Sequence, residues 1–230
     1  MAKNRVTRKQ LLKEPDEFLT TASKLIRWAH ENTRSLVIGC SLFLGVVLLV
    51  SAYGYFQQRR AGAAEVLLGQ ALAKYQAEIE SKTASADALA KVRSDFDALL
   101  ASYGSLPAGR LGAVLYGHIC LAGGAYDDAI AHYQESLAKF GPESSLGNVI
   151  LNGLGTAYQQ KGDYPRAVTY FKQIVDGSSA VLKDVALFNL GRLYGQLGQT
   201  EESRKSYQQL STEFPQSMFA NVVKEKIGNS

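Results

Sequence analysis

The sequence predicts an all-α protein in which a single N-terminal transmembrane helix precedes a solenoid of paired helices. Residues 36–56 form a run of 21 residues without a charged residue, His, Asn, Gln or Pro. After this run, apolar residues recur at three- and four-residue spacing, which favours helices over strands. One pattern of glycines and rings then occurs three times, which is typical of a repeat architecture.

The net charge of +4 belongs to the N-terminal tail, residues 1–35. Residues 1–34 hold eight basic and four acidic residues, and the 17 basic and 17 acidic residues that remain follow the apolar run. A neutral body argues against nucleic-acid binding. Within the tail, the spacing from Pro15 to Ala29 predicts an amphipathic helix. This helix would lie on the inner leaflet or dock on a partner, and the sequence leaves both open.

The apolar run of residues 36–56 is the predicted transmembrane helix, because its length at about 1.5 Å per residue matches the hydrocarbon core of a bilayer. Trp28 on one side and Tyr53 on the other are placed like interfacial aromatics. The basic tail predicts a cytoplasmic N-terminus and a C-terminal domain on the other side. Two alternatives concern processing: cleavage after a signal peptide near Val50-Ser51-Ala52, and a lipoprotein signal ending at Cys40.

Residues 57–107 are expected to form a helical pair. Ala61–Glu80 and Ala86–Tyr103 have helical spacing, with a turn over Ser81–Ser85 and Pro107 after the second helix. This pair could be a degenerate repeat that leads into the solenoid.

Residues 108–230 contain the repeats, at about 110–143, 148–181 and 184–217, and a C-terminal capping helix over Gln216–Ile227. In the second unit the motif is Leu154-Gly155, Tyr158, Gly162, Tyr164, Ala167 and Phe171. The matching residues are Tyr116-Gly117, Cys120, Gly124, Tyr126, Ala129 and Tyr133 upstream, and Leu190-Gly191, Tyr194, Gly198, Thr200, Ser203 and Tyr207 downstream. This pattern resembles the tetratricopeptide repeat, with Cys120, Thr200 and Ser203 as departures from it.

Helix packing explains the sizes of the residues in this motif. Small residues at Gly117, Gly155 and Gly191 are expected to let the two helices of a unit approach closely. The large rings at Tyr133, Phe171 and Tyr207 are expected to fill the gap to the neighbouring unit. Glycines at 124, 162 and 198 are expected to end the first helices in the left-handed conformation. In the capping helix, Phe219, Val222, Val223 and Ile227 are expected to cover the last repeat.

No motif in the chain predicts catalysis, and we expect no enzyme, no cofactor and no metal site. His30, His118 and His132 are too scattered for a metal site, so we expect the latter two to lie on the surface or in a groove. Neither a phosphate-binding loop nor a Gly-x-Ser-x-Gly motif is present. Cys40 falls in the apolar run and Cys120 in the helical region, so the two are not expected to pair.

The resemblance implies a concave groove lined by the first helix of each unit, which would hold polypeptide segments. The positions that face this groove in the family's register are Val114, His118, Leu121, Asn152, Thr156, Gln159, Gln160, Phe188, Arg192 and Gln196. Val114 and His118 stand where carboxylate-clamping members have Lys and Asn, so that ligand is not expected.

The order of basic tail, single span and repeats resembles a bacterial single-span tetratricopeptide family that includes the ancillary subunit of the SecYEG translocon. This resemblance implies an inner-membrane protein with a periplasmic domain, and a chaperone-like scaffold whose partners are translocon subunits, periplasmic chaperones or translocated clients. Two other roles stay open: an envelope-assembly or cell-division scaffold, and a transmembrane regulatory sensor. The sequence names neither the client nor the oligomeric state.

Overall fold

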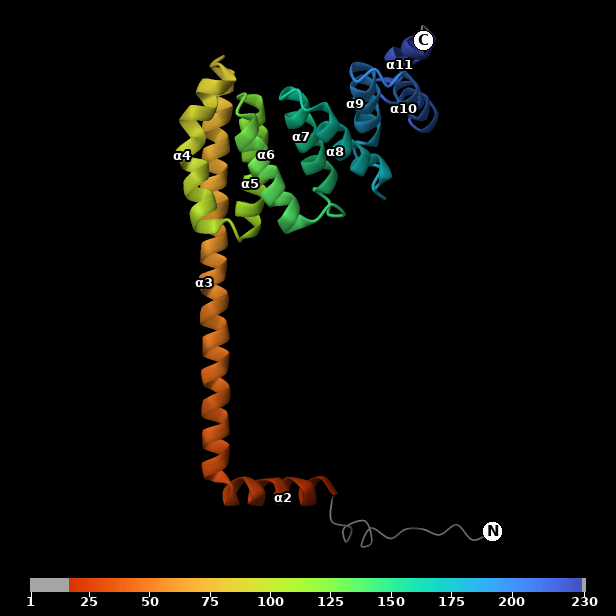
Figure 1. The fold of residues 1–230 in the computed structure, drawn as a ribbon. Helices are drawn as coiled ribbons and strands as arrows, with labels where there is room; N and C mark the ends of the chain where they lie inside the picture. The colour runs from red at the N-terminus through yellow and green to blue at the C-terminus, as the bar shows by residue number, and fades with distance from the viewer. Residues whose placement is uncertain (1–16, 229–230) are drawn as a thin grey trace, which may run out of the picture. The chain divides into compact units, whose positions relative to one another are not determined.

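A computed structural model describes residues 17–228, and the regular elements within that range are all α-helices (Figure 1). The chain divides into two compact units, residues 1–58 and 59–230, with the boundary inside one helix. The helices are α2 Glu17–Glu31, α3 Thr33–Glu80, α4 Ser85–Tyr103, α5 Pro107–Ala122, α6 Tyr126–Phe140, α7 Gly147–Gln160, α8 Tyr164–Asp176, α9 Lys183–Gln196, α10 Thr200–Glu213 and α11 Ala220–Gly228.

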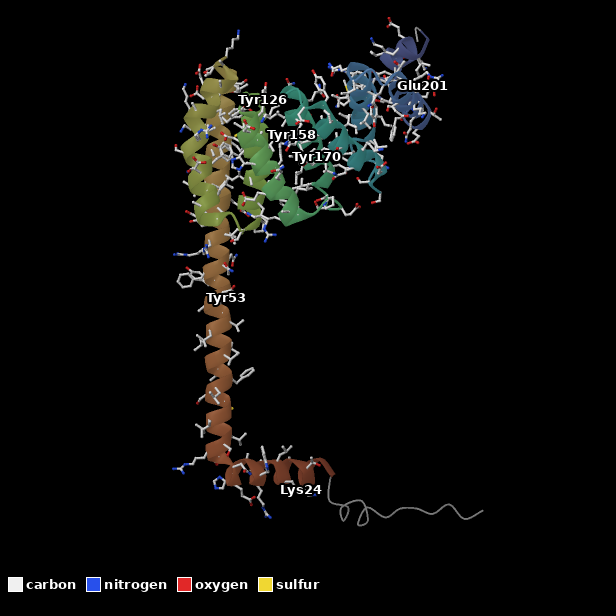
Figure 2. The ribbon with its side chains drawn as sticks, in the orientation of Figure 1. Lys24, Tyr53, Tyr126, Tyr158, Tyr170 and Glu201 are labelled. Carbon is white, nitrogen blue, oxygen red and sulfur yellow. The ribbon has the colours of Figure 1, made fainter. Side chains whose placement is uncertain are left out.

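Helix α3 corrects one expectation, because the apolar run and the helix expected over 61–80 are one continuous helix. No proline interrupts the connection at Gln57–Arg60, and Gln and Arg are good helix formers. The apolar part of α3 is long and apolar enough to cross a membrane, and its side chains are exposed, as Tyr53 is in Figure 2. A signal sequence near an N-terminus meets the same criteria of length and composition.

Helix α2 of the N-terminal unit is the amphipathic helix expected in the tail, and residues 1–16, including Pro15, lie outside the described part of the chain. Leu25 and Ile26 are 61% and 70% exposed, while Lys24 and Arg27 occupy other faces of the helix. α2 ends at Glu31, and α3 begins two residues later at Thr33. At this junction Asn32 Nδ2 donates to the Trp28 carbonyl oxygen at 2.9 Å.

The second unit is a stack in which each helix from α4 to α11 packs on the next (Figure 1). The stripe Ala64, Leu68 and Ala71 of α3, spaced by four and three residues, is buried in the same core that runs on through α9. A smaller cluster joins α9, α10 and α11 through Leu187, Tyr207, Leu210 and Val223. The repeats therefore share a continuous apolar interior.

The predicted small residues and rings meet inside each repeat. A Cβ placed at Gly155 would lie 2.8 Å from Phe171 Cζ, and one at Gly117 would lie 2.8 Å from Tyr133 Cε1. The Tyr133 ring also reaches the next unit, where a Cβ at Gly153 would lie 2.4 Å from its Cζ. Because these distances are shorter than any real carbon–carbon contact, only glycine allows the ring to sit there.

The three glycines expected to end first helices do adopt the left-handed conformation, with φ of 79° at Gly124, 78° at Gly162 and 73° at Gly198. The connection between α8 and α9, residues 177–182, is held by a buried side chain. Asn148 Nδ2 donates to the Val181 carbonyl oxygen at 2.7 Å. The connection is therefore part of the fold and lies against α7.

The capping helix starts later than expected, at Ala220 in place of Gln216. Phe219 and Ile227 pack on the last repeat and Val223 is fully buried, as predicted. The prediction for Val222 was wrong, because its side chain is 48% exposed. Val223 defines the buried face together with Phe219 and Ile227, the residues four positions before and after it. Val222 is rotated from this face by about 100° around the helix axis.

Candidate functional site

A hollow of about 520 Å³ lies between α9, α10 and α11 at the C-terminal end of the stack. Its lining combines aromatic rings, glycines and two basic residues: Phe188, Gly191, Arg192, Gly195, Gln196, Ser203, Tyr207 and Lys226. Three of these residues, Phe188, Arg192 and Gln196, belong to the predicted groove set. The hollow is therefore where the structure brings predicted groove positions together with residues from two other helices.

Phe188 is the aromatic surface of the hollow. Its ring stacks on Phe219 with centroids 4.2 Å apart and an interplanar angle of 12°. The guanidinium carbon of Arg192, one turn later on α9, lies 5.9 Å from the Phe188 centroid. A cation over a ring at this distance is attracted by the negative face of the ring, which helps to orient the exposed guanidinium.

Tyr207 and Ser203 enter the hollow from α10. Tyr207 is 7% exposed, and burial raises the pKa of its hydroxyl while the charge of Arg192 acts in the opposite direction. Ser203 Oγ donates to the Gly191 carbonyl oxygen at 2.6 Å, so this hydroxyl joins α10 to α9. Arg192 and Gln196 thus supply polar donors beside an apolar ring.

The predicted groove positions of the first repeat are placed differently. Val114 is 1% exposed, because it packs among the core residues of the neighbouring helices, so it offers no surface to a ligand and its predicted groove position is wrong. His118 is partly buried, and its Nδ1 lies 2.6 Å from the Tyr133 hydroxyl in a hydrogen bond. Leu121 packs partly buried against the core.

The second repeat presents a polar row. Thr156 Oγ1 donates to the Asn152 carbonyl oxygen at 2.8 Å, which uses its proton within α7. Asn152 Oδ1 is buried and has no hydrogen-bond partner among the described residues. Gln159 is partly buried and Gln160 is exposed. These residues do not line the hollow beside α9.

Sequence reasoning missed part of the lining. Lys226 lies on the capping helix, and the repeat register, which covers the first helices of the units, does not include that helix. The motif predicts a packing role for the Tyr207 ring, which does pack, yet Tyr207 and Ser203 also face the hollow. The four-residue spacing of Gly191 and Gly195 is the feature of the sequence that indicates the hollow, because it leaves one face of α9 without side chains for one turn.

Two titratable groups elsewhere in the stack, Cys120 and His132, take part in its packing. Burial raises the pKa of the Cys120 thiol to about 11, and its side chain is fully buried. His132 is partly buried, its ring packs 4.7 Å from that of Tyr116, and burial lowers its pKa. Among residues 17–228, no cluster of His, Cys, Asp or Glu could hold a metal ion.

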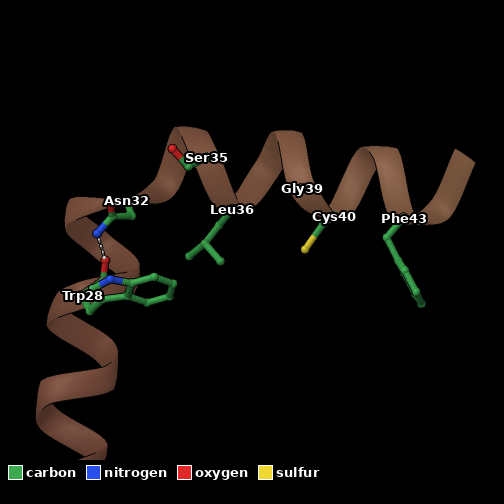
Figure 3. A pocket seen from close by; sticks show the side chains of 7 residues that line it. All are labelled: Trp28, Asn32, Ser35, Leu36, Gly39, Cys40 and Phe43. Carbon is green, nitrogen blue, oxygen red and sulfur yellow. Dashed lines mark hydrogen bonds between the residues drawn. The ribbon is translucent and has the colours of Figure 1, made fainter.

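A second hollow, of about 310 Å³, lies in the N-terminal unit at the junction of α2 and α3 (Figure 3). Leu36, Cys40 and Phe43 point from one face of α3 to the side where the Trp28 ring lies (Figure 3). This surface is mainly apolar and continues the exposed apolar face of α3.

The comparisons with known proteins identify the repeats. The tetratricopeptide repeat family model matches residues 111–180 and 149–212, which overlap in the second predicted unit. Residues 111–212 are therefore tetratricopeptide repeats, and proteins of this kind generally serve as protein-interaction scaffolds. No curated protein matches the chain in sequence.

Two solved structures share the fold. One is a tetratricopeptide repeat protein from Parabacteroides merdae ATCC 43184, with 15% identity, a TM-score of 0.55 and coverage of 69% of this chain. The match spans 57% of the length of that protein. The other is BtubC (BKLC) from P. vanneervenii, with 17% identity, a TM-score of 0.53 and coverage of 75% of this chain and 82% of that one.

Proposed function

We propose that this protein is a membrane-anchored scaffold whose activity is to bind polypeptide segments, without catalysis, along the first helices of its repeats. The observation that carries the proposal is the hollow of about 520 Å³ at α9, where Phe188, Arg192 and Gln196 lie together. A ring, a guanidinium and an amide within one hollow match the side chains and backbone groups that a polypeptide offers.

Exposure of the apolar part of α3 supports the anchoring. Phe43, Leu48 and Leu49 are 68%, 69% and 72% exposed, whereas a core helix of the same length would bury such side chains. Anchoring would also raise the effective concentration of a weak binding surface near its clients. The basic tail supports a cytoplasmic N-terminus, and the predicted order of segments supports repeats in the bacterial periplasm beside the SecYEG translocon.

The first experiment tests the binding surface in cells. A photocrosslinking amino acid replaces Gln196 in the hollow, and a matched variant carries it at Lys172, which is exposed on α8 and lies outside the hollow. We expect polypeptide adducts from position 196 and few from position 172. Equal yields from both positions would contradict the proposal.

The identity of the adducts then separates the roles. Translocon subunits, periplasmic chaperones or nascent secreted chains support a translocon scaffold. Adducts only with envelope-assembly or cell-division components would replace it by that alternative. A phenotype that depends on residues 1–34 alone would favour a regulatory sensor.

Membrane anchoring has its own measurement. The mass of the mature protein and its extraction from membranes by alkaline carbonate are determined together. An intact chain that stays with the membrane supports an anchor, and a chain shortened near residue 52 would show that the apolar segment is a signal peptide.

A further inference from the structure

We propose that helix α2 docks on the surface of the bilayer that α3 crosses, with its apolar side in the lipid and its basic residues at anionic headgroups. This inference rests on the membrane anchoring in the proposed function and adds a second surface through which the chain contacts the membrane.

The exposed apolar side of α2 is the first reason. Leu25 and Ile26 are exposed, and Trp28, which is three residues after Leu25 and neighbours it on the helix surface, is 54% exposed. Arg27 lies about 160° around the helix from Leu25, so the polar and apolar side chains occupy different sides. With 15 residues, α2 is about 22 Å long and too short to cross a bilayer, and an amphipathic helix of this kind lies in the plane of the interface.

The junction with α3 is the second reason, because it makes α2 a separate helix. The chain changes direction at Asn32, whose Nδ2 donates to the Trp28 carbonyl oxygen at 2.9 Å (Figure 3). Thr33 Oγ1 donates to the His30 carbonyl oxygen at 2.7 Å. Carbonyl groups at the end of a helix need such partners where water is scarce. Helix α2 can therefore end beside the lipid, just before the apolar run that starts at Leu36.

Apolar side chains of both helices border one hollow at this junction, which is the third reason. Trp28 borders the hollow of about 310 Å³ from α2. Leu36 and Phe43 border it from α3 and point to the side where the Trp28 ring lies (Figure 3). Since Leu36 and Phe43 belong to the proposed span, the hollow opens to hydrocarbon, and a lipid acyl chain is the occupant that fits it. The apolar side of α2 thus continues the lipid-facing surface of α3.

Charge selects the kind of headgroup. Residues 1–34 hold eight basic and four acidic residues, whereas the segment after the apolar run is neutral. Lys24 and Arg27 of α2 and Arg34 at the start of α3 are exposed. Anionic headgroups attract these residues, so they favour the docked helix, and a neutral bilayer holds it by its apolar side alone.

The first test reads the position of α2 from fluorescence, because Trp28 is the only tryptophan of the chain. In a W28F background, the full chain carries either L25W or H30W and is placed in nanodiscs whose brominated acyl chains quench nearby tryptophan. These positions lie about 140° apart around the helix, and we expect stronger quenching at position 25. A helix that projects away from the bilayer would place position 30 about 7.5 Å nearer to the lipid, so equal or stronger quenching at position 30 would overturn the inference.

The second test measures the effect of charge through hydrogen exchange of the α2 amides in the full chain. A helix of this length is marginal in water, so its amides exchange when it leaves the bilayer and their protection follows the docking equilibrium. In nanodiscs that contain phosphatidylglycerol, K24Q and R27Q should each lower the protection roughly fivefold, the factor for one basic residue at an anionic surface. In phosphatidylcholine nanodiscs the same variants should have little effect.

Two control variants match the charge test. R27K keeps the charge on α2, and K172Q removes an exposed charge on α8. Both should leave the protection of α2 unchanged. Equal protection in the two lipids, or equal losses in R27Q and K172Q, would overturn the selection of anionic headgroups.

The results distinguish failure of this inference from failure of the proposed function. No quenching at position 25 in a chain that resists carbonate extraction would overturn the docking of α2 while the anchor stands. Protein adducts from a photocrosslinking residue at Ile26, without quenching at position 25, would overturn it too and assign α2 to a protein partner. A chain shortened near residue 52 would overturn both the anchor and the docking. Peptide binding at α9 is tested independently, by crosslinking from positions 196 and 172.

Discussion

Replacing Gly191 by alanine should destabilise the third repeat, although alanine is the better helix former. A Cβ at this position would lie 2.3 Å from Cε1 of Tyr207 and 2.6 Å from its Cδ1 and Cζ. The ring is 7% exposed and belongs to the cluster that holds α11, so it cannot move aside without disturbing Leu210 and Val223. Overpacking of this kind costs about 1–3 kcal/mol.

The gain in helix propensity offsets about 1 kcal/mol of that cost. Because the Tyr207 ring is confined, the overpacking cost should lie in the upper part of that range, at about 2–3 kcal/mol. We therefore expect a net loss of about 1–2 kcal/mol in the free energy of unfolding, which corresponds to a fall in Tm of about 2–8 °C for a chain of this size. The measurement is thermal unfolding of the full chain in detergent, followed by far-ultraviolet circular dichroism at the transition of the repeats.

The matched control is Gly195→Ala, one turn away on the same helix. Its new Cβ would meet only Ser203 Oγ at 3.7 Å, an ordinary contact. The control should therefore keep or raise the stability by up to about 1 kcal/mol. If Gly191→Ala is as stable as the wild type, or if both variants lose the same amount, the packing account of the repeat motif is wrong.

Three further predictions concern the pH response, the thiol and the capping helix. Burial lowers the pKa of His118 and His132 below 6.5, so the unfolded chain binds more protons than the folded chain below about pH 6.5. The free energy of unfolding, measured with urea, should therefore fall as the pH drops toward about 5, and it should fall less in a variant with Gln at both positions. Cys120 should resist maleimide at about pH 8 in the folded chain and react in urea, because burial raises its pKa to about 11 and shields its side chain. Mass spectrometry of the Cys120 peptide measures the labelling, and rapid labelling of the native chain would contradict the prediction. Phe188→Ala should cost about 2 kcal/mol and increase hydrogen exchange in α11, whereas Val222→Ala, at an exposed position, should have little effect.

Much of the fold could be predicted because it depends on local and periodic features. Gly124 and its counterparts end first helices in a conformation that glycine adopts without strain, and this holds whatever surrounds them. The pairing of Gly155 with Phe171 likewise follows from the repeat itself, since the same pattern of small and large residues occurs three times. The continuous α3 was missed because Gln57–Arg60 look like a boundary in composition, although nothing there stops a helix.

The candidate site was predictable only in part. The repeat register placed Phe188, Arg192 and Gln196 on one face of a helix, and the structure brings them into one hollow. The same register placed Val114 in the groove, where the structure buries it. Spacing along one helix relates side chains to one another, and the packing of neighbouring helices then decides which of them face a ligand.

The sequence by itself determined that this chain joins a basic tail and an apolar segment to tetratricopeptide repeats, because charge, hydropathy and periodicity are properties of the chain order. Only the tertiary structure decided that Lys226 faces the same hollow as Arg192 and that Phe219 supports Phe188. These residues lie on different segments, and their distances depend on how α11 docks on the last repeat. That docking is set by side-chain packing around Val223, which no local pattern specifies.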